Sequence, residues 1–457
     1  MYCRWLVFFS LMALSIADAF AASPPEISLA GAADALLQRE LKEGSPGATV
    51  LVAKDDRVLY RAARGSANIE LACPLDPQSV FRIGSITKML TAATVLKLVA
   101  ADQLSLDDGL SRFFPDFPNA NNISIAQLLD HTAGISDAWE GDPEHTFSTE
   151  EMVKAIQRQP PDFAPGTAWR YSNSGYLLLG AVIEAVSKKP WHVAMRDLIL
   201  APLGMTRSGF YSDAELVPGF VQGYSVNSAG AIVRPPYVSI AGPGAAGALT
   251  STVDDLFHFM RALATGQVLP AKLYEVMTAA KTTSSGQPVG YGYGVMLGTV
   301  RGEPVIEHNG GIEGFTSQLA YFPKQGVTVV VLANTDAGLP APRSLAHRLG
   351  ALAIGQPYPV FREELLTPET LRSLVGAYRL GSASVHTLTL RDNKLFMRRD
   401  EGPERQMVTA EGGILYFLGD GTDYLRVIRG EHGEVVALEF HADGMEPARR
   451  ELRIRQR

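Results

Sequence analysis

The sequence predicts an α+β fold, in which an antiparallel sheet lies beside a helical region and a small all-β domain follows. Three observations predict this arrangement. An apolar hairpin pattern lies near the start of the chain, helical patterns fill its middle, and strand patterns return near residue 300. After about residue 360, short strand patterns alternate with Gly-rich turns.

The first domain begins with the hairpin. Residues 48–53 predict a strand, 54–57 a turn and 58–61 the returning strand. Apolar residues recur at spacings of three and four over 86–104, which indicates a helix with a wide buried face. Further helices are predicted at 124–131, 149–158, 175–187, 191–199 and 253–264. Strand-type runs at 305–308, 316–322 and 327–332 are expected to complete the sheet.

The second domain is predicted from strand patterns at 385–390, 395–397, 414–418, 424–428 and 435–440. Short strands at this spacing favour a small barrel or sandwich. We place the first domain at 22–360 and the second at 361–457, with the boundary near Gln356–Pro368.

The first 21 residues have the pattern of a secretory signal peptide. Arg4 precedes an apolar run over 5–16, and Ala19-Phe20-Ala21 supplies a small-residue cleavage site. As a helix this run spans ~18 Å, which is short of the ~30 Å hydrocarbon core of a bilayer. We therefore expect an exported protein, periplasmic or secreted, without stable membrane insertion.

Composition excludes several functional classes. The 457-residue chain has a net charge of −7, and no run of Lys or Arg exceeds two residues, which argues against a nucleic-acid partner. Removal of the leader, with Cys3, leaves Cys73 alone, so no internal disulfide is expected. No H-E-x-x-H pair and no phosphate-binding loop occurs. We expect no metal ion and no cofactor, and the sequence leaves the oligomeric state open.

The strongest chemical signal is Ser85-Ile86-Thr87-Lys88, at the start of the helix predicted over 86–104. Residues i and i+3 share a helix face, so the Lys88 amine can reach the Ser85 hydroxyl. A serine becomes nucleophilic when a base takes its proton, and burial can lower the pKa of a lysine enough for it to be that base. The alternative is a serine N-cap followed by a solvated lysine, but the surrounding stretch is too apolar for an outward face.

A second signal is Tyr171-Ser172-Asn173, which follows a Pro-Gly turn and precedes a helix expected from Gly175. Tyr171 and Asn173 are expected in a loop with both side chains on one side. A phenol can transfer a proton to a leaving group, and a carboxamide can bind a lysine or a substrate amide. The alternative is an ordinary turn with a core tyrosine and an asparagine N-cap.

A third signal is His308-Asn309-Gly310-Gly311, expected to end a strand. Glycines let a substrate lie against the strand edge, and the Gly311 amide is available to an oxyanion. A strand-end turn with a surface histidine is the alternative. Each motif alone is near chance frequency, but all three in this order are not.

With these motifs in the order S-x-x-K, Y-x-N and H-x-G, the chain resembles the penicillin-recognising serine hydrolases. That family includes class C β-lactamases, D-alanyl-D-alanine carboxypeptidases, D-aminopeptidases and β-lactamase-like esterases. The resemblance covers about residues 30–350, and includes the stretches 128–135 and 247–252. It implies a β-lactamase/transpeptidase-like sheet flanked by helices with a helical subdomain. The C-terminal strands resemble a small lipocalin-like domain of some members. His131, within 128–135, is interpreted as structural.

The resemblance also implies roles for single residues. Ser85 would be the acylated nucleophile, Lys88 its activating partner, and Tyr171 the proton relay to the leaving group. Asn173, His308, Gly310 and Gly311 would bind substrate, with the amides of Ser85 and Gly311 forming an oxyanion hole. His308 stands where classical β-lactamases have a lysine. A histidine is mostly neutral near pH 7, which disfavours a tyrosinate at Tyr171 and favours Lys88 as a neutral base.

The sequence therefore predicts an exported serine hydrolase of small-molecule or peptide substrates that forms an acyl-enzyme on Ser85. Its substrates would be esters or peptide-type amides, as in an esterase or D-amino-acid peptidase. One alternative is a class C-like β-lactamase, which His308 and the extra C-terminal segment disfavour. The other is a non-catalytic binding protein on the same scaffold, which the presence of Ser85, Lys88 and Tyr171 disfavours.

Overall fold

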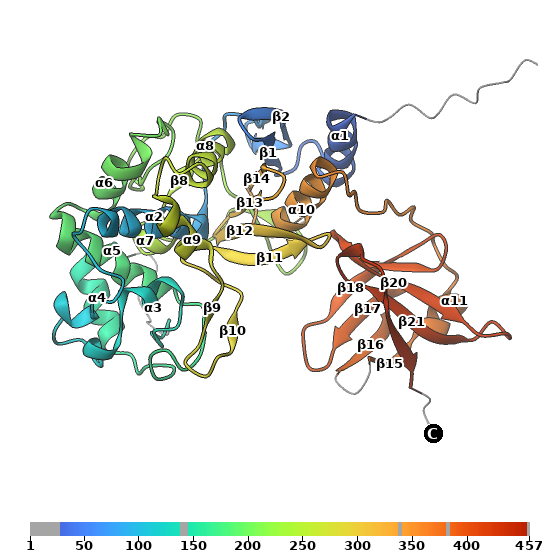
Figure 1. The fold of residues 1–457 in the computed structure, drawn as a ribbon. Coiled ribbons are helices and arrows are strands. Elements are labelled where there is room, and N and C mark those ends of the chain that lie inside the picture. Colours follow the sequence, from blue (N-terminus) through green and yellow to red (C-terminus); the bar gives the residue numbers. More distant parts are fainter. Residues whose placement is uncertain (1–27, 138–144, 337–340, 381–383, 455–457) are drawn as a thin grey trace, which may run out of the picture.

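A six-stranded antiparallel sheet forms the centre of the first domain in the computed structural model, which describes residues 28–137, 145–336, 341–380 and 384–454 (Figure 1). The strand order is β11-β12-β13-β14-β1-β2. The strands are β1 (Ala48–Lys54), β2 (Arg57–Arg64), β11 (Met296–Val300), β12 (Glu303–Ile312), β13 (Phe315–Phe322) and β14 (Val327–Ala333). Pairing of β1 with β14 joins the N-terminal hairpin to the late strands, as the sequence predicts.

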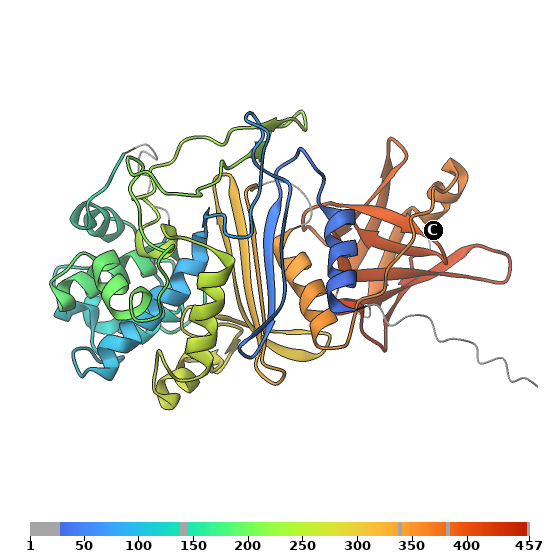
Figure 2. The ribbon, with the colours of Figure 1, turned by 90° about the horizontal axis from the view of Figure 1, so that it is seen from above.

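Helices cover both faces of this sheet (Figure 2). On one face, α1 (Leu29–Glu40) and α10 (Pro342–Ala353) pack on strands whose alternate side chains form one apolar core. The opposite face supports the helical region and a larger core. Every residue of β14 is buried, because this central strand is covered on both faces.

The helical region comprises α2 (Thr87–Ala100), α3 (Ile125–Leu129), α4 (Thr149–Gln157), α5 (Asn173–Ser187), α6 (Trp191–Met195), α7 (Gly244–Gly247), α8 (Val253–Ala264) and α9 (Ala271–Thr278). A π-helical turn, Arg196–Leu200, continues α6. Short ribbons pair β3 (Ser66–Asn68) with β4 (Cys73–Pro74), β5 (Phe81–Arg82) with β8 (Thr250–Ser251), β6 (Ser225–Val226) with β7 (Ile232–Val233), and β9 (Lys281–Thr282) with β10 (Pro288–Val289). None of the helices in the described ranges is both long and apolar enough to cross a bilayer.

The second domain is a closed barrel that follows helix α11 (Pro368–Leu374). Its strands are β15 (Gly376–Leu380), β16 (Ser384–Arg391), β17 (Lys394–Arg399), β18 (Arg405–Ala410), β19 (Ile414–Phe417), β20 (Asp420–Arg429), β21 (Val435–His441) and β22 (Arg449–Arg453). Pairing of β15 with β22 closes it, and Leu371 and Leu374 of α11 join its apolar core. The predicted α+β fold with a C-terminal all-β domain is confirmed.

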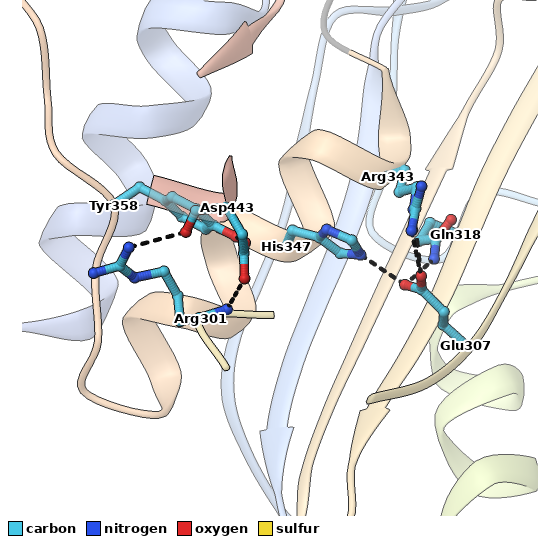
Figure 3. Close-up of polar contacts among 7 residues, drawn as sticks. All are labelled: Arg301, Glu307, Gln318, Arg343, His347, Tyr358 and Asp443. Atoms are coloured by element: carbon cyan, nitrogen blue, oxygen red, sulfur yellow. Dashed lines mark hydrogen bonds and ion pairs between the residues drawn. The ribbon is translucent and has the colours of Figure 1, made fainter. Parts of the chain in front are cut away.

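The two domains meet beside the turn between β11 and β12 (Figure 3). Asp443, in the barrel, accepts hydrogen bonds from the backbone amide of Arg301 and from the Tyr358 hydroxyl. The Arg301 guanidinium also donates to the Asp443 carbonyl, at 2.9 Å. Tyr358 belongs to the linker between α10 and α11, in which the predicted boundary at residue 360 also falls.

Two local predictions are corrected by the structure. The strand predicted at 305–308 is longer in the structure, because β12 extends to Ile312 and His308-Asn309-Gly310-Gly311 pair with β13 near its end. The helix expected from Gly175 begins at Asn173, since the Ser172 hydroxyl accepts from the Gly175 amide and is the N-cap. The predicted signal peptide, residues 1–21, lies outside the described residues.

Candidate active site

Ser85 and Lys88 lie at the junction between a 3₁₀ turn, Gly84–Ile86, and α2. The three-residue spacing puts both side chains on one face, as predicted, and the Lys88 Nζ lies 3.1 Å from the Ser85 Oγ. Ser85 is partly exposed, whereas Lys88 is completely buried. The hydroxyl is therefore accessible from outside, while its lysine neighbour is shielded from water.

The Lys88 amine has two further partners at fixed positions. Nζ lies 2.8 Å from the Asn173 Oδ1 and 2.8 Å from the carbonyl oxygen of Ala246 in α7. Both atoms can only accept hydrogen bonds. An ammonium can donate to all three oxygens, whereas a neutral amine donates to two acceptors and keeps one lone pair for the Ser85 hydroxyl. The three contacts thus suit both forms of a lysine that takes up the serine proton.

Burial lowers the pKa of Lys88 to about 7, against a smaller opposing effect of the Asp137 carboxylate. Removing an ammonium from water disfavours its charged form, and a nearby negative charge favours it. At neutral pH a large fraction of Lys88 is consequently uncharged, which is the state that a general base requires.

Tyr171 is a neighbour of both Ser85 and Lys88. Its ring centroid is 4.8 Å from the Lys88 Nζ, and its phenol interacts with the Ser85 hydroxyl. Burial raises the pKa of Tyr171 well above its ordinary value, although the hydrogen bond with Ser85 acts in the opposite direction. Tyr171 therefore keeps its proton at neutral pH and can act as an acid.

The Asp137 carboxylate lies at the N-terminus of α5 and fixes the orientation of Asn173. Its carboxylate accepts from the backbone amides of Asn173, at 2.8 Å, and Ser174, at 2.7 Å. It also accepts from the Asn173 Nδ2 at 3.2 Å, so the Oδ1 of the same carboxamide faces Lys88. Exposed amides at a helix N-terminus favour a carboxylate. The sequence analysis missed this residue, which no motif marks.

His308 is completely buried and neutral. Burial lowers its pKa to about 3, with a further lowering by Lys88. Its Nδ1 lies 2.6 Å from the Asn309 carbonyl oxygen, which only accepts, so Nδ1 carries the proton and Nε2 accepts from the Tyr291 hydroxyl at 2.8 Å. The His308 and Tyr171 ring centroids are 6.2 Å apart. Tyr291, a second residue that the sequence analysis missed, thus holds His308 as an uncharged neighbour of Tyr171.

His131 is buried behind Tyr171, with ring centroids 4.5 Å apart. Its Nδ1 accepts from the backbone amide of Ser172 at 3.1 Å, and its carbonyl accepts from the amide of Arg170 at 3.2 Å. These contacts hold the loop that carries Tyr171.

The glycines of β12 differ in their surroundings. A Cβ added to Gly310 would lie 2.0 Å from the Ile83 carbonyl oxygen, so this position lets the strand pack against the turn that carries Ser85. A Cβ added to Gly311 would meet no atom within 4 Å. Gly311 instead lines a cavity of about 360 Å³ together with Ser85 and Asn173.

The structure thus brings Ser85, Lys88, Tyr171 and Asn173 into one cluster beside that cavity, with Gly311 in its wall. His308 and Gly310 lie behind this wall and do not line the cavity. The catalytic and binding roles that the sequence assigns to these residues stay predictions.

A β-lactamase-type fold with S-x-x-K and Y-x-N residues converging at one cavity defines the class of penicillin-recognising serine hydrolases. The family model described as Beta-lactamase matches residues 33–353, more than half of the chain, and the chain belongs to that family. The resemblance stated from the sequence is confirmed.

Similarity to individual proteins agrees with this assignment. A D-aminopeptidase of Gluconobacter oxydans (strain 621H) is 30% identical over 324 residues, which are 68% of this chain and 60% of that protein. The chain thus spans less than two thirds of this relative's length.

Two solved structures are also similar. The octameric penicillin-binding protein homologue from Pyrococcus abyssi has a TM-score of 0.64 and 25% identity, and the match covers 89% of this chain and 96% of that one. The D-amino acid amidase from Ochrobactrum anthropi SV3, complexed with D-phenylalanine, has a TM-score of 0.62 and 26% identity, over 72% of this chain and 98% of that one.

Proposed function

We propose that the protein is an exported serine hydrolase that forms an acyl-enzyme on Ser85 and hydrolyses ester or peptide-type amide bonds. The observation that carries this proposal is the buried Lys88 amine, which lies 3.1 Å from the Ser85 hydroxyl. Two fixed acceptors and a pKa of about 7 support its action as a neutral base. Membership of the Beta-lactamase family and similarity to a D-aminopeptidase support the class of reaction.

In acylation, Lys88 takes the hydroxyl proton as the Ser85 oxygen attacks the substrate carbonyl carbon. The carbonyl oxygen gains negative charge, which the backbone amides of Ser85 and Gly311 are expected to stabilise. When the tetrahedral intermediate collapses, Tyr171 donates its proton to the departing oxygen or nitrogen, and the proton held by Lys88 restores the phenol. Water then attacks the acyl carbon, and the same groups transfer its proton back to Ser85.

A panel of substrates tests this proposal. The purified protein is incubated with p-nitrophenyl esters, D-aminoacyl p-nitroanilides and a chromogenic cephalosporin, and each assay is repeated with Ser85→Ala. Ester or anilide turnover that is lost in the variant is the expected result. Rapid hydrolysis of the cephalosporin alone would favour a β-lactamase, and no turnover of any substrate would favour a binding protein.

Export is proposed from the sequence pattern of residues 1–21. Expression of the full chain in a bacterium, followed by cell fractionation and intact-mass measurement, tests it. We expect a species that begins at Ala22, in the periplasm or the medium. An unprocessed cytoplasmic or membrane-bound chain would contradict export.

A further inference from the structure

One acidic residue lines the cavity beside Ser85 within the described part of the chain. Among its lining residues, Glu313 is acidic, His145 carries an imidazole, and the remaining side chains are neutral. Apolar groups, including Phe147, Leu177 and Val238, form much of the surface. Among the residues that the structure describes, a substrate group that enters this cavity therefore meets an apolar wall and one acidic residue.

Glu313 has no cationic partner within the part of the chain that the structure describes. Two other acidic residues of this domain do have such a partner. Asp213 pairs with Arg82 at 2.9 Å, and Glu70 pairs with Arg234 at 2.9 Å. Glu313, a partly buried residue, is thus left to interact with a ligand.

The chain order along β12 indicates that Glu313, just after the strand, lies toward the acyl side of a bound substrate. His308, earlier in this strand, lies near Tyr171, the group that would protonate the leaving group. Gly311 lies in the cavity wall with Ser85, and Glu313 comes two residues further, in the turn to β13. Successive strand residues advance by ~3.3 Å, so the chain moves away from the leaving-group side as it passes Gly311.

We propose that Glu313 is a specificity-determining residue that binds a cationic group, such as a free α-ammonium, on the acyl part of the substrate. This inference rests on the proposed hydrolase function and deepens it. A carboxylate in a partly desolvated cavity attracts a cation more strongly than one in open water. The adjoining apolar surface fits a hydrophobic side chain, so the substrate class is an aminoacyl ester or amide with an apolar side chain and an unblocked amine.

A pair of substrates that differ in the charge tests the proposal. Phenylalanine p-nitroanilide, of either hand, carries the ammonium, and 3-phenylpropanoyl p-nitroanilide lacks the amine. The ratio of their kcat/KM values at pH 7 is measured for the wild type, Glu313→Gln and Glu313→Lys. We expect the preference for the cationic substrate to fall about tenfold in Glu313→Gln and further in Glu313→Lys.

Two controls separate the charge effect from other causes. Glu401→Gln removes the same charge at an exposed barrel position and should keep the wild-type ratio. In the wild type, the preference should weaken as NaCl is raised from 0.05 to 1 M, because salt screens the attraction. Thermal unfolding of each variant shows whether it is folded.

The outcomes distinguish failure of the proposed Glu313 role from failure of the proposed hydrolase function. Turnover that depends on Ser85, with a ratio unchanged in both Glu313 variants, would overturn the role of Glu313 and leave the hydrolase function standing. Absence of any turnover that depends on Ser85 would overturn the hydrolase function and this inference with it.

Discussion

At the scale of single residues, the chemistry depends on how one amine is held. Lys88 is completely buried, and its direct hydrogen-bond partners are two neutral acceptors and a hydroxyl. The Asp137 carboxylate acts on it through space and through Asn173. The arrangement explains how a lysine can be a base near pH 7 without a second lysine nearby.

The pH profile of kcat/KM follows from this pKa. Lys88 must be neutral, so kcat/KM for an uncharged ester should rise with pH through a midpoint near 7. Asp137 raises the pKa of Lys88, so Asp137→Asn should move this midpoint to lower pH. Rates measured from pH 5 to 9 check both points. A midpoint that stays in place or moves upward in the variant would contradict this role of Asp137.

Tyr171→Phe should separate amides from activated esters. An amide nitrogen leaves only when it is protonated, and general acid catalysis contributes typically 10²–10⁴-fold. Hydrolysis of a p-nitroanilide should fall by about this factor, whereas a p-nitrophenyl ester, which leaves as a stable anion, should lose about tenfold or less. Steady-state kinetics on both substrates, with thermal unfolding as a folding control, provide the test. Equal losses on the two substrates would contradict a role of Tyr171 in protonating the leaving group.

At the scale of elements, local periodicity predicted the helices and strands that carry large apolar residues on their buried faces. Helix α8 matches the predicted 253–264, and β14 exceeds the predicted 327–332 by one residue. Helix α10 was missed because its buried face uses small residues such as Ala346 and Gly350, which give little apolar contrast. Asp137 and Tyr291 were missed because neither belongs to a motif, and their contacts with Ser174 and His308 exist only in the folded chain.

The adjacent glycines of β12 predict different effects of one methyl group. In Gly310→Ala the added Cβ meets the Ile83 carbonyl, so the free energy of unfolding should fall by about 1–3 kcal/mol. In Gly311→Ala the methyl meets no protein atom but enters the cavity, so stability should remain and KM should rise. Urea unfolding and steady-state kinetics of both variants test this. Similar stability losses in the two variants would contradict the packing of β12 against the Ser85 turn.

At the scale of the whole molecule, the two domains that the sequence predicts are joined by polar contacts around Asp443. Strand β1 pairs with β14 near the other end of the first domain, and β15 pairs with β22 to close the barrel. These pairings join residues far apart in the sequence, so local patterns predict the strands but not their partners. The contact of Asp443 with Arg301 and Tyr358 has no sequence signature, because it joins a turn, a linker and a barrel loop (Figure 3). On the opposite side of α10, buried Glu307 pairs with His347 at 2.7 Å and Arg343 at 2.9 Å, which attaches this helix to the sheet.

Asp443→Ala should therefore loosen the two domains from each other. The variant loses the acceptor for the Arg301 amide and the Tyr358 hydroxyl, while both apolar cores remain intact. Calorimetry should show the unfolding of the barrel and of the first domain further apart in temperature than in the wild type. Unchanged separation would contradict a coupling role for Asp443. Glu401→Ala, in an exposed barrel turn, is the control.

Covalent labelling of the serine tests the central claim most directly. The folded protein is treated with a fluorophosphonate between pH 5 and 9, and the labelled peptide is located by mass spectrometry. We predict one adduct on Ser85, formed at a rate that rises with pH through about 7 and is lost in Lys88→Met. No adduct, an adduct on another residue, or equal labelling without Lys88 would contradict an activated nucleophile at this position.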